Sequence, residues 1–265
     1  MIIVAMILLT LVLMASVFYK VNVPVIILSL MIGLIFGSDV TGIIYLDNAL
    51  LVKEIANAAL MFILFIGGFG TKQQHFRLVL TPVLIMSTLG IMLTAVITGY
   101  LFHLITGWSF MNSLLVASII SSTDAAAVFS IFKGHPIEAR IKTMAELESV
   151  SNDPMAIVFT MFVINLMVGQ QTSTLASILS FSWQLVGGVG IGLSIGLLAV
   201  HIFHKIRHIE AEYFYIYLIS IVLLSYSIAN AAQTSGMLSS FFAGFVIGNK
   251  QIPYKKGLMA FCNSL

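Results

Sequence analysis

The chain has 265 residues, of which 60% are hydrophobic and only 8% are charged, against about 25% in an ordinary soluble domain. Its mean hydropathy is +1.09, and several apolar stretches exceed the roughly 18 residues that a helix needs to cross a bilayer. This composition argues against a soluble enzyme, and a formal net charge of +2 gives no reason to expect a nucleic-acid partner. We predict an all-α polytopic membrane protein.

Apolar runs between polar breaks predict nine membrane spans in one transmembrane domain, 1–265. The first run has neither the basic segment nor the cleavage site of a signal peptide, so we expect it to stay as a span. An odd number of spans and an abrupt end predict that the chain is part of a longer protein. In chain order the spans are roughly 1–19, 24–38, 55–70, 78–104, 110–132, 143–168, 179–203, 213–232 and 238–248.

The connections between these spans sort by charge. Eleven of the twelve basic residues fall on one side of the membrane: Lys20, Lys72, Arg77, Lys133, Arg140, Lys142, Lys205, Arg207, Lys250, Lys255 and Lys256. The other side carries Asp39, Asp47, Lys53 and Glu54 and is otherwise nearly neutral. Because basic loops stay in the cytoplasm, we predict an inner-membrane protein whose N-terminus faces outward.

Four acidic residues fall inside predicted spans: Asp124, Glu146, Glu148 and Asp153. A charge at bilayer depth costs at least about 2.5 kcal/mol and usually marks an ion or proton pathway. At about 1.5 Å per residue, Asp124 and Asp153 lie near the midplane on consecutive antiparallel spans, where they can face one another. Glu146 is shallower, and we expect it simply to reach the membrane interface.

The surroundings of both aspartates are rich in oxygen atoms. The run Ser121–Asp124 consists of residues that are poor in helix interiors, so we expect an unwound segment, which a membrane tolerates only in a cavity or within protein. In the next span, Glu148–Pro154 combines carboxylates, hydroxyls and an amide, and Pro154 leaves the carbonyl of Val150 without its usual partner. Ser149 and Asp153 are four residues apart and share a helix face.

Such a cluster suits hard monovalent cations. A buried carboxylate also takes up a proton more readily than an exposed one, so one aspartate can bind either a proton or a cation. Mutual exclusion at a site that opens alternately to each side gives antiport. Two alternatives remain: a cation channel, and an intramembrane aspartyl protease, whose glycine-flanked aspartate motif is absent from this sequence. Side-chain identity does not decide between potassium and sodium.

The motifs Ser121–Ser130 (SSTDAAAVFS) and Glu148–Pro154 (ESVSNDP) resemble those of the monovalent cation:proton antiporters of the CPA1 group. They look most like the bacterial potassium/proton antiporter branch known as cell volume regulation protein A. The likeness runs along the whole chain, since Leu64–Gly68 and Gly244–Asn249 also match in position.

The resemblance implies a sodium/proton-antiporter-like fold of about 13 spans in two inverted repeats, here 1–168 and the start of the second at 179–265, and a homodimer without a cofactor. It implies that Asp153 is the shared ligand of cation and proton, that Ser149 and the Thr123 carbonyl are further ligands, and that Asp124 lies beside them. Asn152 stands where an electrogenic relative has an aspartate, which implies electroneutral exchange.

The resemblance also implies a structural ion pair between Glu148 and an arginine of a later span, which this chain does not contain. Ile66 stands where many relatives have an acidic residue. Gly188, Gly192 and Gly196 form a series that lets helices pack closely. We expect that packing within one subunit, with a subunit contact as the second possibility.

Overall fold

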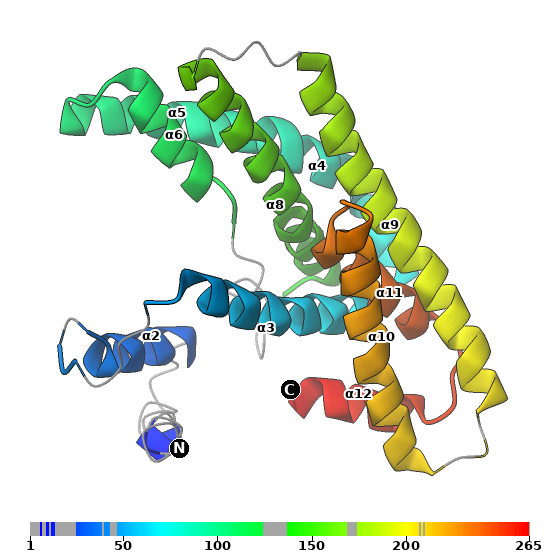
Figure 1. Cartoon of the computed structure of the whole chain (residues 1–265). Helices are drawn as coiled ribbons and strands as arrows, with labels where there is room; N and C mark the ends of the chain where they lie inside the picture. Colours follow the sequence, from blue (N-terminus) through cyan, green and yellow to red (C-terminus); the bar gives the residue numbers. More distant parts are fainter. Residues whose placement is uncertain are drawn as a thin grey trace. The chain divides into compact units, whose positions relative to one another are not determined.

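The computed structural model describes residues 6, 9–10, 12–13, 25–38, 40–42, 47–123, 137–168, 174–206, 208 and 210–264 (Figure 1). Every regular element in these ranges is a helix, which confirms the all-α prediction. The helices are α2 (Val25–Phe36), α3 (Ala49–Gly70), α4 (Gln73–Ile85), the π-helix η2 (Met86–Gly90), α5 (Ile91–Thr106), α6 (Phe110–Ile120), α8 (Ala139–Val168), α9 (Thr174–Lys205), α10 (Ala211–Ala231), α11 (Gly236–Asn249) and α12 (Lys255–Ser264).

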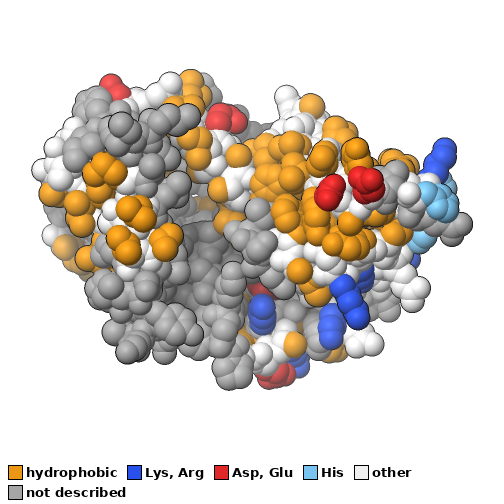
Figure 2. Space-filling view, turned by 90° about the horizontal axis from the view of Figure 1, so that it is seen from below, with side chains coloured by type: hydrophobic (Ala, Val, Ile, Leu, Met, Phe, Trp, Pro, Cys, Tyr) orange, Lys and Arg blue, Asp and Glu red, His pale blue; other side chains and the backbone are white. Residues whose placement is uncertain are grey.

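Five stretches of helix in the described part are long and apolar enough to cross a membrane: Ala49–Gly70, Leu78–Thr106, Ala139–Val168, Ser182–Lys205 and Ala211–Ala231. Large apolar side chains on them point outward, and Val186, for example, is 70% exposed. On the described part of the face in Figure 2, hydrophobic side chains form a broad patch that contains few charged ones.

Most predicted spans coincide with helices, but their ends differ. Helix α3 begins at Ala49, six residues earlier than predicted, so Lys53 and Glu54 belong to the helix and not to a loop. Helix α8 begins four residues early, at Ala139. Helix α12 was not predicted at all. The predicted first span, 1–19, falls almost entirely outside the described residues.

The chain forms two compact units, one of Met1–Ala59 with Ala127–Pro136 and a larger one of Leu60–Ala126 with Ile137–Leu265. In the first, Leu28 and Ile32 of α2 are buried. The larger unit has an aromatic core contributed by the second half of α3 together with α9, α10 and α11. Its fully buried members include Phe65, Phe203, Leu218 and Ile247.

The predicted span 78–104 is one long helix with a π-turn inside it. Pro82 lies in α4 and has no N–H to donate, and η2 follows one turn later. The hydroxyl of Thr88 donates a 2.7 Å hydrogen bond to the carbonyl of Leu84 at this irregular turn. The helix then continues as α5, so the irregularity does not interrupt the span.

The three glycines of α9 lie against α11. A Cβ atom at Gly188 would lie 2.8 Å from the carbonyl oxygen of Ser235, one at Gly192 2.4 Å from that of Ser239, and one at Gly196 2.7 Å from Cβ of Val246. Packing within one subunit is therefore confirmed for this series.

A second close crossing joins α3 to α11. A Cβ at Gly68 would lie 2.0 Å from the carbonyl oxygen of Phe241, and one at Gly244 would lie 2.2 Å from that of Phe65. Helix α11 thus packs backbone to backbone on α3 and α9, and its polar end is tied to α4. The side chain of Asn249 accepts a 2.9 Å hydrogen bond from the Gln73 amide and donates one of 2.8 Å to the carbonyl of Thr71.

Candidate functional site

Helix α6 stops inside the predicted fifth span. It begins at Phe110 after an N-cap, the hydroxyl of Ser109, which accepts from the Asn112 amide. It ends at Ile120, and the hydroxyl of Ser121 donates a 2.8 Å hydrogen bond back to the carbonyl of Ser118. Ser122 and Thr123 continue without helical structure. The predicted unwinding is confirmed as far as Thr123, and Asp124 lies outside the described residues.

The two residues after α6 bind one turn of α8. The hydroxyl of Ser122 donates a 2.8 Å hydrogen bond to the side-chain oxygen of Asn152. The amide nitrogen of Asn152 donates to the hydroxyl of Thr123 at 2.6 Å and to one carboxylate oxygen of Glu148 at 3.0 Å. Both ends of the Asn152 amide are thereby used, which fixes the orientation of the group.

Thr123 completes the network. Its hydroxyl donates to the second oxygen of Glu148 at 3.1 Å and lies 2.9 Å from the hydroxyl of Ser149. Because the single Thr123 proton goes to the carboxylate, Ser149 is the donor in the second contact. The carboxylate of Glu148 receives one hydrogen bond on each oxygen. Among the described residues, the network places neutral groups around one carboxylate, and their hydrogen bonds hold its two oxygens in place.

Two of the α8 residues in this network are fully buried. Ser149 and Asn152 have no exposed surface, and Val150 beside them is equally buried. Asp153 follows Asn152 directly within helix α8, and its side chain lies outside what the structure describes. Of the six residues that the sequence singled out, the structure brings Thr123, Glu148, Ser149 and Asn152 together. The direct roles of Asp124 and Asp153 stay predictions.

A further polar contact lies about two turns along α8. The hydroxyl of Thr160 donates a 3.1 Å hydrogen bond to that of Ser118, which is fully buried on α6. The sequence interpretation missed this pair. The available signal was the spacing, since Thr160 follows Asp153 by seven residues and falls on the same helix face. The polar seam between α6 and α8 is longer than the motif itself.

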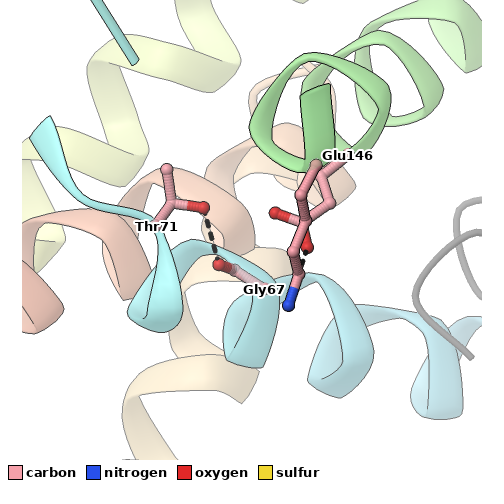
Figure 3. A network of polar contacts seen from close by, with 4 residues as sticks. Gly67, Thr71 and Glu146 are labelled. Atoms are coloured by element: carbon pink, nitrogen blue, oxygen red, sulfur yellow. Dashed lines mark hydrogen bonds and ion pairs between the residues drawn. The ribbon is translucent and has the colours of Figure 1, made fainter. Parts of the chain in front are cut away.

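Glu146 is buried among other residues of the protein, and its position relative to the membrane interface stays a prediction. It is only 4% exposed, and one of its carboxylate oxygens lies 3.8 Å from Nζ of Lys142. The hydroxyl of Thr71, at the end of α3, lies within reach of the same carboxylate and donates a 2.9 Å hydrogen bond to the carbonyl of Gly67 (Figure 3). Thr71 thus brings a contact to Glu146 from a segment far away in sequence.

Comparison with known proteins agrees with this geometry. The family model for the transmembrane sodium/hydrogen exchanger matches residues 5–262. The K(+)/H(+) antiporter NhaP2 of Shewanella oneidensis is 35% identical over 233 residues, which are 87% of this chain and 40% of that protein. The K(+)/H(+) antiporter NhaP of Alkalimonas amylolytica is 31% identical over 236 residues, 88% of this chain and 41% of that protein.

The solved structure of the sodium proton antiporter MjNhaP1 from Methanocaldococcus jannaschii superposes with a TM-score of 0.74 at 26% identity, and the match covers 100% of this chain and 66% of that one. The predicted antiporter-like fold is thus confirmed. The chain spans about 40% of the length of the two K(+)/H(+) antiporters above. The chain is a multi-pass membrane protein and belongs to the transmembrane sodium/hydrogen exchanger family.

Proposed function

We propose that the protein is a secondary antiporter that exchanges a monovalent cation, K⁺ or Na⁺, for protons by alternating access. The observation that carries this proposal is the hydrogen-bond network that joins Thr123 and Glu148 to the fully buried Ser149 and Asn152 in an apolar helical protein. Buried polar groups are costly inside a membrane protein and are kept at ion pathways. Relatives named as K(+)/H(+) and Na(+)/H(+) antiporters support the same reaction.

In this proposal Asp153 is the group on which the cation and the proton compete. The hydroxyl of Ser149 and the carbonyl of Thr123 supply further oxygen ligands, and Asp124 lies beside them. Glu148 keeps a structural role and pairs with an arginine outside these 265 residues. A permanent ion pair between Asp153 and a basic side chain would prevent exchange, because the carboxylate must be free to bind either the proton or the metal cation.

Asn152 supports a ratio of one proton for each cation. Its amide carries no titratable proton and is held by Ser122, Thr123 and Glu148. It cannot bring a second proton into the cycle, so exchange at Asp153 alone is electroneutral.

The remaining features of the proposal concern the whole protein. The basic side of the membrane is the cytoplasmic side, the N-terminus is outside, and the location is the inner (plasma) membrane. Residues 1–168 form the first repeat, and 179–265 begin the second. Two copies form a homodimer.

The experiment is an exchange assay in proteoliposomes with the protein at its full natural length. Internal pH is followed after addition of Na⁺, K⁺ or Li⁺, for the wild type, for Asp153→Asn and for the matched control Asp47→Asn, since Asp47 is exposed next to the start of α3. We expect exchange in the wild type and the control and none in Asp153→Asn. Full exchange in Asp153→Asn would place the site elsewhere, and steady ionic current would indicate a channel.

A further inference from the structure

Glu146 is a buried carboxylate for which the exchange cycle described above has no use. It lies two residues before Glu148 but on a different side of α8, outside the hydrogen-bond network. Only 4% of its surface is exposed. An ionised carboxylate in such a place is destabilising unless close partners compensate for the loss of water.

The partners of Glu146 in the described part of the chain are weak. The ammonium group of Lys142 is 3.8 Å away, and the Lys142 side chain is 46% exposed, so solvent screens this pair. The Thr71 hydroxyl has one proton, which it donates to the carbonyl of Gly67 at 2.9 Å. No other described charged side chain forms an ion pair with Glu146. Protonation of Glu146 would therefore break no strong contact with the described residues.

The position of Glu146 on α8 links solvent to the candidate site. Lys142, Glu146, Ser149 and Asp153 follow one another at intervals of four, three and four residues, which places them on one face of an unbroken helix. Seven residues separate Glu146 from Asp153, or about 10 Å along the axis. Glu146 therefore occupies the level between exposed Lys142 and buried Ser149.

We infer that Glu146 relays protons between solvent at the Lys142 end of α8 and Asp153. A proton that leaves the Asp153 carboxyl passes through water to an oxygen of Glu146, which becomes a neutral acid. Glu146 then gives the proton to solvent and regains its charge, and loading of Asp153 follows the same steps in reverse. The inference rests on the proposed exchange function.

The test replaces the carboxylate by an amide of the same shape. Uptake of radioactive rubidium or sodium is measured in proteoliposomes for the wild type, Glu146→Gln, Glu146→Asp and the control Glu138→Gln, since Glu138 is exposed just before α8. Each is assayed at low and high concentration of a membrane-impermeant zwitterionic buffer on both faces, at constant ionic strength. A small buffer acid can replace a missing proton relay but cannot repair a missing structural contact.

We expect Glu146→Gln to slow exchange by about 100-fold, the lower end of what a positioned proton acceptor contributes, and high buffer to restore much of the rate. The wild type, Glu146→Asp and Glu138→Gln should not respond to buffer. If Glu146→Gln does not reconstitute, Glu146→Ser makes the same test. Exchange in the variant at the wild-type rate, or a slow rate that buffer does not raise, overturns the relay. Absence of exchange in the wild type overturns the proposed function instead.

Discussion

The amide nitrogen of Asn152 donates a 2.6 Å hydrogen bond to the hydroxyl of Thr123, and this contact joins the middle of α8 to the segment where α6 has ended. The two residues are 29 positions apart in the chain. Because the helix has stopped before Thr123, its backbone carbonyl is not bound into α6, while its hydroxyl is oriented by α8. The contact thus holds Thr123, whose carbonyl we propose as a cation ligand, against α8.

Replacing Asn152 by aspartate should change the charge balance of exchange. The variant Asn152→Asp places a second titratable carboxylate beside Asp153, so it can carry a second proton in each exchange cycle. We expect exchange to become sensitive to membrane voltage, measured in proteoliposomes clamped with potassium and valinomycin. The control Asn48→Asp changes the exposed cap of α3, whose oxygen accepts from Leu51. Voltage-independent exchange by Asn152→Asp would contradict the assigned ratio.

Removing the Thr123 hydroxyl should weaken cation binding. Thr123→Val keeps the shape of the side chain but takes away the donor to Glu148 and the acceptor for Asn152. A hydrogen bond to a charged group is worth about 1.5–3 kcal/mol, so we expect the apparent KM for the cation to rise about tenfold or more. Thr94→Val is the control, because its hydroxyl only bonds the Gly90 carbonyl on an exposed part of α5. Equal KM values for the two variants would remove Thr123 from the site.

The α3–α11 crossing should not tolerate a methyl group. In Gly244→Ala the new Cβ would lie 2.2 Å from the carbonyl oxygen of Phe65, so the two helices must separate. We expect a loss of about 1–3 kcal/mol in unfolding free energy, measured as a lower midpoint of thermal unfolding in detergent. Gly190→Ala is the matched control on α9, since nothing lies within 4 Å of its added Cβ. Equal midpoints would mean that the helices are not in contact at Gly244.

The thiol of Cys262 on α12 should react slowly with maleimides. Cys262 is 3% exposed, and burial raises the pKa of its thiol from 9.0 to about 11. The reactive thiolate is therefore scarce in the folded protein, and the labelling rate should still be rising above pH 9. As pH rises, the Cys262 thiol ionises in the unfolded chain before it ionises in the folded protein. The contribution of the neutral thiol to the free energy of unfolding is therefore complete below pH 9 and declines towards pH 11. Rapid labelling at pH 7 would contradict the burial.

Local sequence predicted those parts of the site that depend on neighbours along the chain. The run from Ser121 to Thr123 stops α6 through its own hydroxyls, and the turn from Glu148 to Asn152 is set by helix periodicity. The burial of Glu146 was not predictable in this way, because one of its contacts, Thr71, lies just after α3 and is far away in sequence. Helix α12 was missed for another reason, since its ten residues begin with Lys255 and Lys256 and do not resemble a span.

The central claim is that a proton and a metal cation compete for the carboxylate of Asp153. The most direct measurement is the dissociation constant of Na⁺ or K⁺ for the purified protein at a series of pH values, by calorimetry in detergent. Competition for one carboxylate predicts that, at acidic pH, the constant rises about tenfold for each pH unit, and that Asp153→Asn does not bind the cation. A dissociation constant that stays the same at every pH, or cation binding by Asp153→Asn at wild-type strength, would contradict the account.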